Sequence, residues 1–187
     1  MNFKYTNILL FILLFLTPTS KSAETLYLYK GNFSRTIKIE DLNNFQKSKV
    51  PSYKLKKLIK ITNQNEENLH KILSYEIDIP IKTTSKLMNS KIGKVFLSRM
   101  SKIIYPNKLF DKNIGTKAIR SSILLSSYKN KQKVNLINFF KAYPNKNIAI
   151  NLNSLSKTLK KVESLKELIK FYSNSPFKKL KDGSSSI

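Results

Sequence analysis

The chain has 187 residues, with 35 lysines and arginines against 11 aspartates and glutamates and no cysteine, which gives a formal charge of +24. The lack of cysteine excludes disulfides, a thiolate nucleophile and zinc sites built from cysteine. Nucleic acid is an unfavoured partner despite the charge, because only three basic residues are arginines and the lysines are spread along the whole chain.

Residues 1–23 have the pattern of a cleavable secretory signal peptide. A weakly basic start is followed by an apolar run at 8–16 and then by small residues around Pro18. The run has nine residues, whereas a bilayer-spanning helix needs roughly 20, so we predict export rather than anchoring. Cleavage after Ser22 and cleavage after Ala23 are both compatible with this pattern. The predicted destination is the periplasm, the thylakoid lumen or the medium.

Two strand-like segments at 25–30 and 33–39 predict a β-hairpin, because Gly31 and Asn32 between them form a typical two-residue turn. Residues 147–152 alternate apolar and polar side chains and predict a late strand. We expect this strand to join the hairpin in a small antiparallel sheet.

Most of the remaining chain has helical periodicity. An amphipathic helix is predicted at 91–104, and the most buried helix at 116–128, where serines would permit close packing. Two Tyr-Pro-Asn-Lys sequences, at 105–108 and 143–146, are interpreted as helix stop signals because proline cannot continue a helix. The other predicted helix starts are at Asp41, Ser52, Asn63 or Asn65, Thr83 or Thr84, Asn135, and Asn153 or Ser154, and residues 78–81 are predicted to be extended.

The last predicted helix has an apolar side and a polar side rich in lysine. A helix of this kind can lie on an anionic membrane, can dock on its own domain, or can bind a partner protein. The lysines that are candidate contacts to an anionic surface are Lys157, Lys160, Lys161, Lys166 and Lys170. Residues 173–187 are poor in apolar side chains and predict a disordered tail.

Four segments carry a family resemblance: Ala-Glu-Thr-Leu-Tyr-Leu-Tyr-Lys-Gly at 23–31, Ile-Glu-Asp-Leu-Asn-Asn-Phe at 39–45, Gly-Thr-Lys-Ala-Ile-Arg at 115–120, and Val-Asn-Leu-Ile-Asn-Phe-Phe-Lys-Ala-Tyr-Pro at 134–144. With them the chain resembles the uncharacterised domain that precedes the α/β-hydrolase domain of secreted cyanobacterial proteins. The resemblance implies export and a cyanobacterial source. Because it starts at Glu24, it also favours cleavage after Ala23.

The nucleophile elbow of an α/β-hydrolase, Gly-x-Ser-x-Gly, is absent from the sequence, whose four glycines are far apart. His70 is the only histidine, and Glu66 lies one helical turn before it. This spacing would suit a carboxylate that orients a general base, but a solvated helix face has the same pattern and no nucleophile accompanies it. One histidine and scattered acids do not make a metal site, so we predict no catalytic residue, metal or cofactor.

The sequence therefore predicts an α+β fold, with a mostly helical single domain at 24–172 and a small sheet formed by the hairpin and the late strand. We expect an exported, non-catalytic accessory or binding domain, whose partner is a separately encoded hydrolase. The first alternative is a protein that binds an anionic membrane or polysaccharide through lysine-rich faces. The second is a divergent hydrolase with an unrecognised active site.

Overall fold

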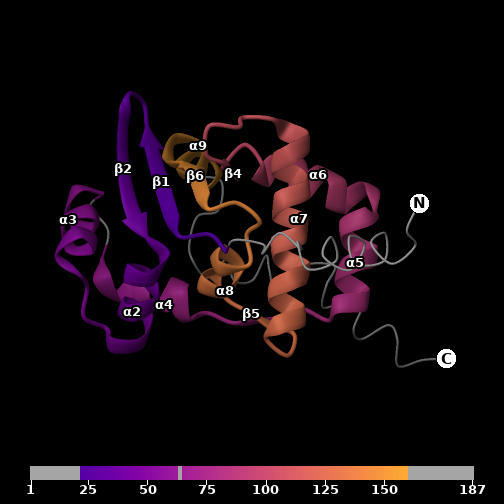
Figure 1. The fold of residues 1–187 in the computed structure, drawn as a ribbon, viewed down its shortest axis with the longest axis horizontal. Helices are drawn as coiled ribbons and strands as arrows, with labels where there is room; N and C mark the ends of the chain where they lie inside the picture. Colours follow the sequence, from indigo (N-terminus) through magenta and orange to yellow (C-terminus); the bar gives the residue numbers. More distant parts are fainter. Residues whose placement is uncertain (1–21, 63–64, 160–187) are drawn as a thin grey trace, which may run out of the picture.

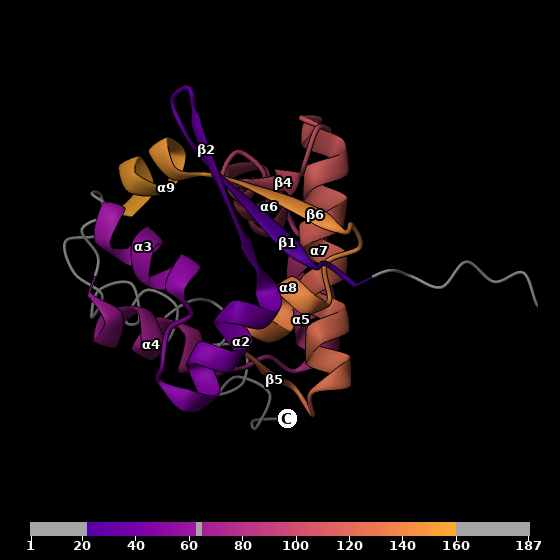
Figure 2. The ribbon, with the colours of Figure 1, turned by 60° about the vertical axis from the view of Figure 1, so that its left-hand side comes forward.

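The computed structural model describes residues 22–62 and 65–159, which form the α+β domain shown in Figures 1 and 2. Most of the predicted leader, the second half of the last predicted helix and the predicted tail lie outside the described residues. The strands are β1 (Thr25–Lys30), β2 (Phe33–Lys38), β3 (Ile77–Asp78), β4 (Ile104–Pro106), β5 (Lys133–Val134) and β6 (Asn147–Asn151). The helices are α2 (Ile39–Ser48), α3 (Tyr53–Ile61), α4 (Glu66–Ser74), α5 (Ile81–Asn89), α6 (Lys91–Met100), α7 (Lys112–Lys129), α8 (Leu136–Lys141) and α9 (Leu152–Leu159).

The predicted hairpin and late strand are confirmed, but the sheet is mixed rather than antiparallel. Lys30 pairs with Phe33 across the turn, where Gly31 has the left-handed φ of +59° that favours glycine. β6 pairs with β1 in parallel, in the strand order β2-β1-β6-β4. The reason is that the chain leaves β2 through the helices and returns at the end of the sheet where β1 begins, so that β6 runs in the same direction as β1.

The helix predicted at 91–104 is shorter than expected. It ends at Met100 as α6, and Ile104 belongs to strand β4. Ile104 pairs with Ile150 of β6 in antiparallel register. Ile148, Ala149 and Ile150 are all buried, and since successive strand residues face opposite sides, both faces of β6 are covered. β6 therefore runs through the core of the domain, between the hairpin and β4.

Side-chain caps fix the starts of several helices. Ser52, Asn65, Asp111 and Asn135 each accept a hydrogen bond from a backbone N–H in the first turn of α3, α4, α7 and α8, respectively. Of the two asparagines predicted to start α4, Asn65 is the one that caps it. α7 begins at Lys112, earlier than predicted.

α5 and α9 also start at other residues than predicted. α5 begins at Ile81, directly after Pro80, rather than at either threonine, because the fixed φ of proline suits a helix entry. α9 begins at Leu152, and the side chain of Asn151 accepts a hydrogen bond from the Ser154 N–H at 3.0 Å. The cap of α9 is therefore the last residue of β6.

Helix α7 is the long central helix of Figure 1, and its buried side is built from small residues. Ser122, Ser126 and Ser127 have no exposed surface, and the Ser122 hydroxyl donates to the Phe139 carbonyl of α8. The close packing predicted for these serines is confirmed. Tyr128, the last residue of the helix predicted to be the most buried, is instead 74% exposed, because two residues, or about 200° of helical rotation, separate it from the buried Ser126.

Candidate functional site

In the described part of the chain, the contacts of His70 are those of a residue that holds helices together. Its Nε2 lies 2.9 Å from the Gln46 carbonyl oxygen and 3.4 Å from the Ser74 hydroxyl. The ring also packs edge-on against Phe45, with ring centroids 5.9 Å apart. No hydrogen bond joins His70 to Glu66 in the described residues, so the structure does not bring the proposed acid–base pair together.

Among residues 22–62 and 65–159, no three histidine, cysteine, aspartate or glutamate side chains come close enough to hold a metal ion. Over the same ranges, no helix has both the length and the apolar character that crossing a membrane requires.

The two Tyr-Pro-Asn-Lys sequences lie beside each other, although they are far apart in the chain. Pro106 lies in β4 and pairs with Ile148 of β6, so only Pro144, which follows the end of α8 at Lys141, fits the predicted helix stop. Both prolines line an open depression of about 280 Å³ on the side of α7. Their asparagines support the sheet: Asn107 accepts from the Tyr29 hydroxyl at 2.7 Å, and Asn145 accepts from the Asn147 N–H at 2.9 Å. These contacts give both sequences a structural role.

Of the lysines predicted to contact an anionic surface, only Lys157 lies within the described residues. It is exposed on α9, whereas Leu152 and Leu155 of the same helix pack against the core. The first turns of this helix are thus docked on their own domain. Lys160, Lys161, Lys166 and Lys170 lie outside the described residues.

A second lysine-rich surface, which was not predicted from the sequence, lies at the end of α2 and along α3. We call it the α3 surface. All of its lysines are exposed, and none forms an ion pair within the described residues. These lysines are Lys47, Lys49, Lys54, Lys56, Lys57 and Lys60. Residues 42–65 contain no aspartate or glutamate, a signal that was readable in the sequence.

Large apolar side chains also project from the α3 surface. Tyr53 is 81% exposed, more than any other large apolar or aromatic residue in the described part of the chain. Val50 is 71% exposed and Ile61 is 55% exposed. The opposite side of the helix is anchored, since Leu55 and Ile59 are buried in the core.

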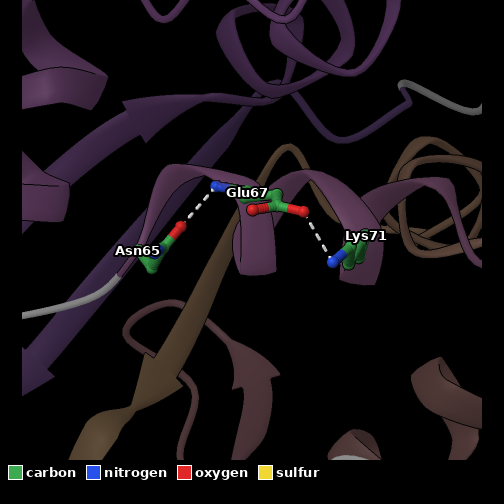
Figure 3. Close-up of polar contacts among 3 residues, drawn as sticks. All are labelled: Asn65, Glu67 and Lys71. Atoms are coloured by element: carbon green, nitrogen blue, oxygen red, sulfur yellow. Dashed lines mark hydrogen bonds and ion pairs between the residues drawn. The ribbon is translucent and has the colours of Figure 1, made fainter.

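Helix α4 follows α3 in the chain, and its first turn carries two acids, Glu66 and Glu67. Asn65 accepts a hydrogen bond from the Glu67 N–H at 2.7 Å, and Glu67 forms an ion pair with Lys71 at 2.7 Å (Figure 3). The hydrogen bond and charge of Lys71 lower the pKa of Glu67, and Lys49 adds to this effect. Glu67 is therefore already paired.

The sequence model of one protein family matches residues 22–151, and its description is "Alpha/beta hydrolase of unknown function (DUF1400)". The match covers most of the chain and nearly all of the described domain, and the chain belongs to this family. Neither a curated protein nor a solved structure matches the chain significantly.

The matched residues fold as the mostly helical domain described above. Its four-stranded sheet has a single parallel pair, β1 with β6, whereas an α/β-hydrolase presents its nucleophile on a sharp turn between a strand and a helix of a parallel sheet. The family description contains the word hydrolase and gives the function as unknown, so it assigns no substrate to the matched residues.

Proposed function

We propose that this chain is a non-catalytic accessory or binding domain of its family, acting on a separately encoded hydrolase. The observation that carries the proposal is the environment of His70. A general base needs a free ring nitrogen aimed at a nucleophile or a substrate. Here Nε2 is engaged with the Gln46 carbonyl, the ring packs against Phe45 between α2 and α4, and neither ring nitrogen forms a hydrogen bond with a carboxylate within the described residues.

An esterase assay tests the proposal directly. The purified chain should hydrolyse p-nitrophenyl acetate no faster than an equal concentration of a protein of similar lysine content. Hydrolysis that is faster than this control, and that is lost in His70→Ala while the variant stays folded by circular dichroism, would overturn the proposal. Co-expression with a hydrolase encoded beside this chain should yield a complex that survives gel filtration.

A second function is favoured by the charge: attachment to an anionic membrane or polysaccharide. Within the described residues only two ion pairs form, Lys71 with Glu67 and Lys146 with Glu24, so most lysines have no acidic partner. Such binding should weaken steeply with added salt, because salt screens charges over about 10 Å at 0.1 M. Co-sedimentation with anionic vesicles and with dextran sulfate across a salt series measures it, and absence of binding at low salt would exclude it.

We also propose that the chain is exported and is processed after Ser22 rather than after Ala23. The support is that Ala23 is 5% exposed and belongs to the core. Cleavage after Ser22 keeps Ala23 in the core, whereas cleavage after Ala23 removes it. N-terminal sequencing of the exported protein decides between them, and a chain that starts at Glu24 would contradict the proposal.

A further inference from the structure

The outward side of α3 forms one continuous row of side chains. Tyr53, Lys57 and Ile61 are spaced by four residues, so they lie above one another on a single face of the helix. All three are exposed, whereas Leu55 and Ile59 on the opposite face are buried. The helix is thus fixed to the domain by one side and presents this row to the outside.

The lysines are arranged around this row. With about 100° between successive helical residues, Lys60 lies next to the row, and Lys54 and Lys56 lie on its two flanks. α3 has four lysines in nine residues and no acid, the highest density of basic residues among the described helices. A row of apolar and aromatic side chains flanked by lysines is typical of helices that lie in the headgroup region of a bilayer.

We propose that the α3 surface docks the protein on bilayers that contain anionic lipids. This inference rests on the second function proposed above and specifies its surface and its partner. Lipid is favoured over polysaccharide because Val50, Tyr53 and Ile61 need an apolar phase, which a polysaccharide chain does not provide. The aliphatic stem of Lys57 completes the apolar row, while its ammonium group reaches the headgroups.

The test compares two matched triple variants of the full chain. Lys54→Gln, Lys57→Gln and Lys60→Gln remove three charges from the α3 surface. Lys91→Gln, Lys94→Gln and Lys102→Gln remove three exposed charges from α6 and the turn after it, and α6 lies on the opposite side of the view in Figure 1. The control is close in composition, because Ile92 and Val95 of α6 are also exposed, at 66% and 52%.

Binding is measured by co-sedimentation with vesicles of equal parts phosphatidylglycerol and phosphatidylcholine, and with pure phosphatidylcholine vesicles. Each lysine near an anionic membrane strengthens binding about fivefold, so the α3 triple variant should bind roughly a hundredfold more weakly. The α6 triple variant should bind within about threefold of the unmodified chain, since its lysines do not face the membrane. A third variant, Tyr53→Ser with Ile61→Ser, should weaken binding about tenfold or more, also at high salt, because its loss is of apolar contact.

Equal losses in the two lysine variants would overturn the inference, because binding would then follow total charge, although attachment to anionic surfaces would stand. Unchanged binding of the Tyr53→Ser, Ile61→Ser variant, or equally tight binding of the unmodified chain to dextran sulfate, would also overturn it in favour of a purely electrostatic contact. No binding of the unmodified chain to any anionic probe would exclude attachment as a whole.

Discussion

Gln46 and His70 link α2 to α4 through hydrogen bonds that run in both directions. His70 Nε2 donates to the Gln46 carbonyl at 2.9 Å, since a carbonyl oxygen can only accept. In return, the Gln46 side-chain amide donates to the Leu73 carbonyl of α4 at 2.8 Å. Phe45 of α2 is buried, and the His70 ring of α4 contacts it edge-on. The histidine therefore holds two helices together at the edge of the core.

Replacing His70 should accordingly lower stability. In His70→Ala the Gln46 carbonyl loses its partner and Phe45 loses a ring contact, and we expect the free energy of unfolding to fall by about 1–3 kcal/mol. Urea denaturation followed by circular dichroism measures the change. Glu66→Gln is the matched control and should change stability by no more than about 0.5 kcal/mol, because Glu66 is exposed. An equal loss in both variants would contradict a role centred on the histidine.

Gly93→Ala should lower the stability of the protein, although alanine has a higher helix propensity than glycine. In an isolated helix, Gly→Ala is stabilising by about 1 kcal/mol. In this fold a Cβ at Gly93 would lie 1.9 Å from the Leu87 carbonyl oxygen and 2.8 Å from the Met88 Cα. These are backbone atoms at the junction of α5 and α6, so the helices must separate, and we expect Gly93→Ala to lower stability by about 2 kcal/mol or more.

Thermal or urea unfolding of Gly93→Ala decides the sign. Lys94→Ala, at an exposed position of the same helix, should stay within about 0.5 kcal/mol of the unmodified chain. A more stable Gly93→Ala protein would mean that α5 and α6 are not in contact at this position.

Local features were predicted well because their causes are local. Gly31 and Asn32 define the hairpin turn, and capping residues such as Ser52 and Asn135 bond to backbone groups three residues away. The parallel pairing of β6 with β1 depends on contacts between residues more than a hundred positions apart. No local pattern specifies that direction, and β4 is too short to show an alternation at all.

The same distinction applies to the candidate site. Tyr53 and Leu55 both belong to the helix predicted to start at Ser52, but Leu55 is buried and Tyr53 is the most exposed large apolar or aromatic side chain in the described part of the chain. Which side of a nearly uniform apolar and basic helix faces the core depends on the neighbouring elements. For this reason the sequence shows that the chain is rich in lysine, but only the fold shows which side chains of α3 form an exposed surface.

Ser122 should tolerate even a small change poorly. Its side chain has no exposed surface and its hydroxyl donates to the Phe139 carbonyl, which joins α7 to α8. Ser122→Ala leaves that carbonyl without this donor and should lower stability by about 1–2 kcal/mol. Ser122→Val also adds volume where two helices approach closely, and should cost about 1–3 kcal/mol more.

Ser121→Ala provides the control for both changes, because Ser121 is exposed on the same helix and loses no contact with α8. We expect its denaturation curve to overlay that of the unmodified chain. If Ser122→Ala overlays it as well, the bond to Phe139 contributes nothing to the packing of α7 on α8.

Tyr143 combines complete burial with a hydroxyl that has no hydrogen-bond partner in the described residues. Burial raises its pKa well above the ordinary value of 10.0, because the charged form would have to exist in the core. Above about pH 10 the unfolded chain releases this proton and the folded chain keeps it. The unfolded state then binds fewer protons, so stability is unaffected below about pH 10 and falls as the pH rises further.

Tyr143→Phe removes both the buried hydroxyl and this titration. At pH 7 the variant should match the unmodified chain or exceed its stability by up to about 1 kcal/mol, since no hydrogen bond is lost. Above pH 10 its advantage should grow, by at most about 1.4 kcal/mol per pH unit. Tyr105→Phe should show a smaller pH effect, because Tyr105 is only partly buried and its pKa is raised less. Urea denaturation at pH 7, 9, 10.5 and 11 measures these differences, and a Tyr143→Phe protein that is less stable at pH 7 would show that the hydroxyl has a partner in the core.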